Sequence, residues 1–226
     1  MQAPMPSNLV QLTLDLPFNE AMTRDDFIVS DANRQAFDFV SAWPDWPANV
    51  VLLAGPAGSG KTHLANIWAH EAGAQRHRAK NLTFETIESW LETGALVLED
   101  LDFHSLDEIA LFHLVNTVRG GQGFLLMTCE QPLSDWSLTL PDLASRLRAA
   151  VPVDIGAPDD ALMRQIFVKQ FTDRQISIEP QVIDYLVNRM ERSLNSVREL
   201  VCRLDEAAFS QGRAITKRLA AEVIDF

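Results

Sequence analysis

Short apolar runs alternate with helix-like segments between residues 50 and 155. The run Val50–Ala54 is apolar and lies between residues that break regular structure, which is typical of a strand buried on both faces. Similar runs follow at residues 96–98, 124–127 and 151–153, each separated from the next by a helix-like segment. This alternation predicts an α/β fold with a parallel sheet and right-handed crossovers.

The clearest single helix is predicted to begin at Ser105. Ser105 and Glu108 have the spacing of a capping box, in which each side chain bonds the backbone N–H of the other residue. Apolar residues at helical spacing continue to Val118, and Gly120 follows them. We therefore expect one amphipathic helix to pack on the sheet here.

Strand signals stop after Ile155. Residues 156–158, Gly-Ala-Pro, indicate a hinge, and the chain beyond them has only helical spacing of apolar residues, with three helices and a short fourth from Thr216. Residues 1–20 contain prolines and no helical period. We expect a flexible tail over residues 1–20, an α/β domain over 21–155 and a helical domain over 156–226.

Charge and composition narrow the function. The net charge of -12 repels nucleic acid, so we expect no direct, sequence-specific DNA binding by this chain alone. No apolar run is long enough to cross a bilayer and no signal segment is evident, so no membrane association is expected. Cys129 and Cys202 lie in apolar segments without metal or redox spacing, which indicates buried thiols in a reducing, cytoplasmic setting.

Residues 55–62, Gly-Pro-Ala-Gly-Ser-Gly-Lys-Thr, match the phosphate-binding P-loop, and a predicted strand precedes them while a helix follows. Gly55, Gly58 and Gly60 let backbone N–H groups turn toward phosphate oxygens at the start of a helix. Lys61 would reach the outer phosphates, and the Thr62 hydroxyl would bind Mg²⁺. The motif predicts a site for ATP or ADP with Mg²⁺.

An acidic pair ends the predicted strand at residues 96–98. Glu99 would hold Mg²⁺ and Asp100 would face the attacking water, although an Asp more often comes first in such pairs. Two solvated carboxylates are the simpler alternative, and the inverted order leaves the chain's own ATP hydrolysis open. Thr128 ends the next strand and could contact the γ-phosphate or the water; alone, it is more often a core hydroxyl.

Two arginines are candidates for phosphate contact. Arg146 precedes the last predicted strand, and Arg198 would take the second position of a helix that begins with a capping box at Ser196 and Glu199. A guanidinium offered from a neighbouring subunit stabilises charge on a transferred phosphoryl group. The alternative for a lone surface arginine is an exposed salt bridge.

Together these residues resemble the AAA+ core of the bacterial replication initiator DnaA over roughly residues 24–226. The resemblance rests on residues 60–64, including His63 beside the P-loop, and on residues 99–103, 111–116, 143–147 and 197–200. It implies that Arg146 is the arginine finger, Arg198 the second sensor and Thr128 the first sensor. It also implies that Phe27, Ile28 and Val29 form the wall of the adenine pocket.

The tail carries a second resemblance. Gln11, Leu12, Leu14, Leu16 and Phe18 are similar to the short peptide by which proteins bind the replication sliding clamp. We expect no DNA-reading domain after the helical part. A DnaA-like core with a clamp peptide resembles the Hda family of DnaA-related regulators. A β-arm or plain disorder is the alternative for the tail.

The resemblance implies an AAA+ P-loop NTPase, with a five-stranded parallel sheet flanked by helices and a small all-helical lid. It implies a regulator that binds ADP or ATP and the clamp, and that stimulates ATP hydrolysis on DnaA through Arg146. Self-association is also plausible, because AAA+ relatives pack side by side. The alternatives are an autonomous ATPase and a DnaA-like helicase loader.

Overall fold

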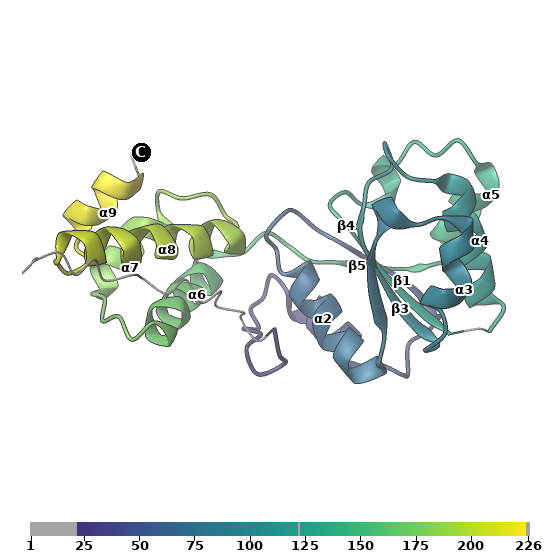
Figure 1. Ribbon diagram of the computed structural model, residues 1–226, viewed down its shortest axis with the longest axis horizontal. Helices are drawn as coiled ribbons and strands as arrows, with labels where there is room; N and C mark the ends of the chain where they lie inside the picture. The colour runs from purple at the N-terminus through teal and green to yellow at the C-terminus, as the bar shows by residue number, and fades with distance from the viewer. Residues whose placement is uncertain (1–21, 122, 225–226) are drawn as a thin grey trace, which may run out of the picture.

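The computed structural model describes residues 22–121 and 123–224 and separates them into a sheet domain and a helical lid (Figure 1). The sheet has five parallel strands in the order β2-β3-β4-β1-β5. β1 therefore lies between β4 and β5, and its carboxyl end opens at the same edge as the ends of its neighbours. The strands are β1 (Val50–Ala54), β2 (Gln75–Arg78), β3 (Ala95–Leu101), β4 (Phe124–Cys129) and β5 (Val151–Asp154).

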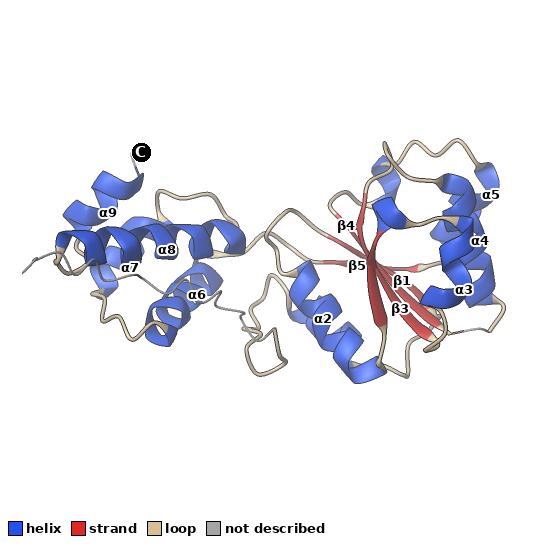
Figure 2. Ribbon diagram, viewed as in Figure 1, coloured by secondary structure: helices blue, strands red, loops and turns tan. Residues whose placement is uncertain are grey.

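Helices cover both faces of this sheet (Figure 2). One face packs against α1 and α2, and the other packs against α3, α4 and α5, so two separate apolar cores flank the strands. This arrangement explains why the central strands read as continuous apolar runs rather than alternating ones. The elements of these layers are α1 (Arg34–Ser41), α2 (Lys61–Ala72), η1 (Ala79–Asn81), η2 (Phe84–Thr86), α3 (Ile87–Trp90), α4 (Glu108–Arg119), η3 (Leu133–Asp135) and α5 (Pro141–Arg148).

The lid consists of the four helices that follow β5, and it has its own apolar core (Figure 1). Phe167, Phe171 and Leu204 are among the side chains buried there. The expected fold class, a parallel five-stranded sheet with flanking helices and a helical lid, is confirmed. The lid helices are α6 (Asp160–Asp173), α7 (Pro180–Val187), α8 (Leu194–Gln211) and α9 (Lys217–Ile224).

The strand that apolar runs did not locate is β2. Its residues, Gln75–Arg78, are Gln-Arg-His-Arg, and they pair only with β3 at the edge of the sheet. An edge strand with one neighbour leaves much of its surface in water, so it needs no apolar side chains. Its pairing therefore depends on the backbone of β3 rather than on a sequence pattern.

Both predicted capping boxes were wrong about where their helices begin. The cap of α4 is Asp107, which accepts a hydrogen bond from the Ala110 N–H at 2.9 Å, while Ser105 donates to Asp102. The cap of α8 is Ser193, so the helix begins at Leu194 and Arg198 lies in its second turn. Several polar residues near each start compete for the cap position, and tertiary contacts decide which one takes it.

The start of α8 is fixed by a direct contact between the lid and the P-loop. The Leu194 N–H donates to the carbonyl oxygen of Gly58 at 2.9 Å. Gly58 has a φ of +68°, and a Cβ there would meet the Ser193 side chain. A second backbone bond, from Gly156 to Ala32 at 2.9 Å, holds the hinge that follows β5.

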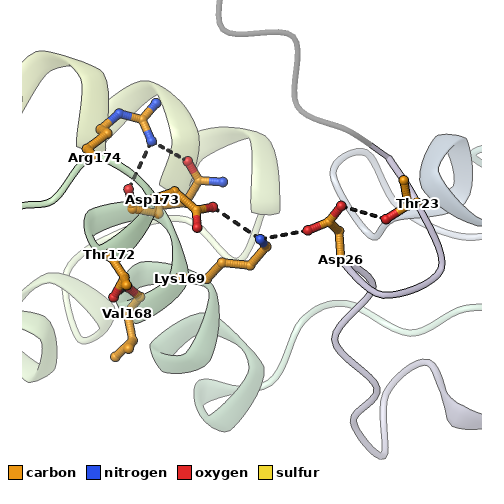
Figure 3. Close-up of polar contacts among 8 residues, drawn as sticks. Thr23, Asp26, Val168, Lys169, Thr172, Asp173 and Arg174 are labelled. Carbon is orange, nitrogen blue, oxygen red and sulfur yellow. Dashed lines mark hydrogen bonds and ion pairs between the residues drawn. The ribbon is translucent and has the colours of Figure 1, made fainter.

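A partly exposed network of ion pairs adds a third link across the two parts (Figure 3). Lys169 on α6 lies 2.9 Å from Asp26 in the sheet domain and 3.1 Å from Asp173 on its own helix. Thr23 donates to Asp26 at 2.6 Å, which steadies the carboxylate that Lys169 approaches. The lid is thus attached to the sheet domain through both α6 and α8.

Three further expectations concern the tail, membrane-spanning helices and the two cysteines. The predicted clamp peptide, Gln11 to Phe18, lies outside the described residues. Among the described residues no helix has the length and apolar character needed to cross a membrane. Cys129 is buried as expected, but Cys202 is exposed, because it lies on the outer side of α8 beside the Arg174 guanidinium.

The contact at Gly58 leads to a stability prediction. Gly73, at the end of α2, also has a positive φ, of +63°, but nothing lies within 4 Å of a Cβ added there. We expect Gly73→Ala to lower the free energy of unfolding by about 1 kcal/mol through backbone strain alone. Gly58→Ala should lower it by about 2–4 kcal/mol, because the new methyl group also displaces Ser193.

Urea denaturation of the two variants beside the parent protein measures this difference. Equal losses at the two positions would mean that the lid moves away from residue 58 without cost, and the contact would then have no role in holding the lid.

Candidate nucleotide-binding site

The P-loop joins the centre of the sheet to the start of α2. β1 ends at Ala54, residues 55–60 turn back, and α2 begins at Lys61. Gly60 has a φ of +105°, which side-chain-bearing residues rarely adopt. A Cβ at Gly55 would lie 2.4 Å from the carbonyl oxygen of Ile155, so the loop can pass β5 only as glycine. The three glycines of the motif are thus each required by the local backbone or its neighbours.

Lys61 is held against the loop itself. Its Nζ donates to the carbonyl oxygens of Gly55 at 2.7 Å and Pro56 at 2.8 Å. Burial lowers the pKa of Lys61, and the nearby carboxylates of Glu130 and Asp100 oppose that shift. A partly buried ammonium group at the N-terminus of a helix gives the loop a strongly positive interior, which suits phosphate groups.

A cavity of about 410 Å³, here called the lid cavity, lies between the P-loop, residues 22–33 and the lid helices α6 and α8. Of the predicted residues, Gly58, Gly60, Lys61, Thr62 and His63 line its P-loop side. Both domains contribute to its wall, so its shape depends on how the lid sits.

Aromatic contacts build the far wall of the lid cavity. Phe27 stacks on Phe37 with ring centroids 5.3 Å apart and meets the His63 ring edge-on at 5.1 Å. Phe27 and Ile28 line the cavity, whereas Val29 is not among its lining residues. The buried Asn33 fixes this segment, because its Nδ2 donates to the Ile28 carbonyl oxygen at 3.0 Å. A flat apolar wall with nearby polar groups suits a nucleotide base.

The lid supplies charged groups to the same cavity. Arg198 on α8 and Lys169 on α6 both line it (Figure 3 shows Lys169). The hydrogen bond from Lys169 lowers the pKa of Asp26, and the same bond raises the pKa of Lys169. Both groups therefore stay charged at neutral pH, and the link between α6 and the sheet domain persists there.

A second cavity of about 410 Å³, here called the acidic cavity, opens on the other side of the P-loop. Lys61 and Thr62 line it together with Asp100, Asp102 and Thr128. Thr128 is buried, and its Oγ1 accepts a hydrogen bond from the Asp100 N–H at 3.1 Å. That bond supports the left-handed backbone of Asp100, whose φ is +59°. Thr128 thus positions the acid that faces the cavity.

The structure separates the two acids of the predicted pair. Asp100 faces the acidic cavity, but Glu99 is not among its lining residues. Both oxygens of Glu99 contact the Arg76 guanidinium, at 2.9 and 3.1 Å. Among the described residues no group of three or more His, Cys, Asp or Glu could hold a metal. The Thr62 hydroxyl and the Asp100 carboxylate are oxygen donors that fit Mg²⁺ bound mainly through nucleotide phosphates.

Arg146 lies apart from both cavities. It is exposed on α5, and its guanidinium forms no hydrogen bond or ion pair with any residue in the described ranges. Its backbone carbonyl oxygen accepts a bond from Arg119 at 3.3 Å. The side chain is therefore free of the chain's own P-loop and is presented to the surroundings.

Sequence reasoning missed several residues of the site. Lys169 and Asp26 are 143 positions apart, and neither belongs to a motif. Asp102 lines the acidic cavity and accepts bonds from the His104 N–H and the Ser105 hydroxyl, a pattern that its position two residues after the acidic pair could have indicated. Cys129 also lines that cavity, but burial raises its thiol pKa to about 12, which keeps it protonated and unreactive.

Comparison with known proteins identifies the lid first. A family described as "Hda, lid domain" matches residues 160–223, which include nearly all of α6 to α9. The chain is also 23% identical over 231 residues to the chromosomal replication initiator protein DnaA of Cutibacterium acnes. That match covers 91% of this chain but 46% of the relative, so the chain spans about half the length of the curated relative.

Solved structures agree on the fold. Domain III of the Thermotoga maritima replication initiation protein DnaA superposes with a TM-score of 0.78 at 16% identity, covering 93% of this chain and 98% of that one. AMPPCP-bound DnaA from Aquifex aeolicus gives a TM-score of 0.70 at 21% identity, covering 85% and 67%. The lid is therefore of the Hda type, and the chain as a whole is related to DnaA in sequence and shares the fold of DnaA domain III.

Proposed function

We propose that this chain is a nucleotide-bound regulator of replication initiation that stimulates ATP hydrolysis on DnaA through Arg146. The observation that carries the proposal is the position of Arg146. The guanidinium is exposed on α5 and lies outside both cavities that flank the chain's own P-loop. An exposed arginine outside its own chain's cavities would be available to the site of a docked neighbour, which supports the proposal.

The nucleotide has a structural role in this proposal. ADP or ATP would place its base against Phe27 and its phosphates on the P-loop, while Arg198 would reach it from α8. The nucleotide would then contact both domains, because the lid cavity has walls from each. Binding would stabilise the seated position of the lid and so give the chain one defined shape for docking.

The catalytic effect would be electrostatic. Charge spreads over the phosphoryl oxygens during transfer, and a guanidinium placed there from a neighbouring chain accelerates hydrolysis by roughly 10³–10⁵. Arg146 would supply that charge to ATP held by DnaA. The ATP-holding chain supplies its own P-loop, metal and water, so Arg146 adds the missing charge and takes no proton.

Within this chain, Asp100 replaces Glu99 as the acid we propose beside Mg²⁺ and water. Asp100 lines the acidic cavity with Thr62, and Thr128 fixes its backbone. Magnesium would supply Lewis-acid stabilisation of phosphate charge when bound. These residues also support a second candidate, an autonomous ATPase, which steady hydrolysis by the purified chain without partners would favour.

The remaining partners rest on sequence. Residues 11–18 are proposed to bind the sliding clamp, which would raise the local concentration of this chain near DnaA on DNA. The net charge of -12 fits a protein that meets DNA through partners. Self-association stays a proposal, as does the helicase-loader alternative, which capture of helicase instead of clamp would support.

Nucleotide binding can be tested at Lys61. Lys61→Ala removes the ammonium group whose Nζ lies at the P-loop carbonyls, so affinity for ADP should fall roughly 10- to 100-fold, the value of a charged hydrogen bond. Isothermal titration with ADP measures the change, and Lys217→Ala in the exposed lid surface is the charge-matched control. Unchanged affinity in Lys61→Ala would remove the P-loop from the proposal.

The regulatory step can be tested at Arg146. Arg146→Ala should bind ADP like the parent protein but lower stimulation of DnaA hydrolysis by at least about 10³, the lower range for such arginines. The assay measures phosphate release from ATP-loaded DnaA with clamp loaded on DNA. Arg148→Ala, an exposed arginine in the same turn of α5, is the control and should keep most of the stimulation. Full stimulation by Arg146→Ala would exclude it as the arginine finger.

Clamp binding can be tested in the tail. Changing Gln11 and Leu12 together to Ala removes the polar and apolar anchors of the predicted peptide, so clamp affinity should fall at least about tenfold while ADP binding stays unchanged. Surface plasmon resonance on immobilised clamp measures the first quantity. Clamp binding at parental strength would assign the contact to another part of the chain.

A further inference from the structure

Glu99, the acid that the sequence predicted for Mg²⁺, forms an ion pair with an arginine from the edge strand. Arg76 on β2 places its Nη2 2.9 Å and 3.1 Å from the two carboxylate oxygens of Glu99 on β3. The side chains keep 33% and 13% of their exposure, so the pair is partly shielded from water. The contact is therefore stronger than a fully exposed ion pair of the same geometry.

Glu99 lies on the side of the sheet that carries the P-loop helix. Val97, two residues earlier on β3, packs in the core beneath α2, and residues two apart on a strand share a face. Arg76 also donates through Nη1 to Asn66 on α2. Asn66 follows Thr62 by four residues and thus lies one helical turn along the same face. Arg76 therefore links Glu99 to α2 at Asn66, one turn after the residue whose hydroxyl is expected to bind Mg²⁺.

We propose that Arg76 is a positioning residue that keeps Glu99 from Mg²⁺ and so makes nucleotide binding by this chain only weakly dependent on the metal. Mg²⁺ prefers carboxylate oxygens, but a guanidinium already neutralises this carboxylate and contacts both of its oxygens. The inference rests on the proposed nucleotide site. It accounts for a chain that holds nucleotide as a structural element instead of turning it over.

The neighbouring pair shows why Arg76 and not Arg78 is the restraint. Arg78, two residues later on β2, lies 3.8 Å from Asp100, with side-chain exposures of 63% and 65%. At that distance and exposure the pair contributes little. Asp100 thus stays available to the acidic cavity, while Glu99 is bound.

The test measures ADP affinity by isothermal titration in excess Mg²⁺ and in EDTA, and it takes the ratio of the two. The parent ratio should stay below about twofold, and Arg76→Gln should raise it roughly three- to tenfold, the range of a partly shielded ion pair. Arg164→Gln, which breaks a pair with Asp184 in the lid, is the matched control and should keep the parent ratio. Mn²⁺ electron paramagnetic resonance on the ADP complex should show tighter metal binding in Arg76→Gln.

Glu99→Gln completes a double-mutant cycle. Alone it should leave the Mg²⁺ ratio within about twofold of the parent, because Glu99 is already paired with Arg76. Combined with Arg76→Gln, it should cancel the rise in the ratio that Arg76→Gln causes. If Arg76→Gln unfolds, Arg76→Lys, which keeps the charge but not the planar fork, should give an intermediate ratio. A Mg²⁺ ratio for Glu99→Gln alone that differs from the parent ratio by clearly more than about twofold, or no gain in a folded Arg76→Gln, would overturn the inference.

The outcomes separate this inference from the proposed function. A parent chain that binds ADP but shows no effect at Arg76 contradicts only the role of Arg76. A parent chain that binds no nucleotide contradicts both proposals. Stimulation of DnaA through Arg146 involves another surface and is measured independently.

Discussion

The seating of the lid on the P-loop is the contact on which the rest of the site depends. Leu194 donates its first helical N–H to the Gly58 carbonyl oxygen, and the absence of a side chain at Gly58 lets Ser193 approach. The phosphate-binding loop and the start of α8 are thereby built as one unit. The same contact sets where α8 begins, and this places Arg198 toward the lid cavity. A single backbone bond thus joins the P-loop to the lid.

Two sides of the P-loop have different chemistry. The lid cavity has an aromatic wall and charged groups from both domains, so it suits a base and the outer parts of a nucleotide. The acidic cavity holds Asp100 and Asp102 beside Lys61, so it suits phosphate, metal and water. Glu99 does not line the acidic cavity, and its carboxylate is bound by Arg76. Arg146, the proposed arginine finger, is exposed on α5 and lines neither cavity.

Several parts of the structure could be predicted from sequence because they depend on local order. The central strands are buried on both faces and must be apolar, so their runs stand out. The P-loop requires glycines at fixed spacing, so its strand, turn and helix follow from eight residues. The edge strand Gln75–Arg78 could not be found in this way, because water covers much of it and its pairing comes from β3.

Sequence alone determined the fold class and the phosphate loop, since each depends on a periodicity or a short spacing that the backbone imposes locally. It also made Arg146 a candidate, through its place before the last predicted strand and the resemblance to DnaA. Tertiary structure alone decided the rest. Contacts with distant segments lie at the starts of α4 and α8, where Glu108 accepts from the Leu140 N–H and the Leu194 N–H donates to Gly58. Lys169 likewise reaches Asp26 only because the lid packs against the sheet domain. Glu99 and Asp100 are adjacent in sequence, yet Arg76 engages one and the acidic cavity takes the other. An ion pair between distant residues depends on their positions in space, so, unlike a helical or strand period, it cannot be recognised from the order of residues.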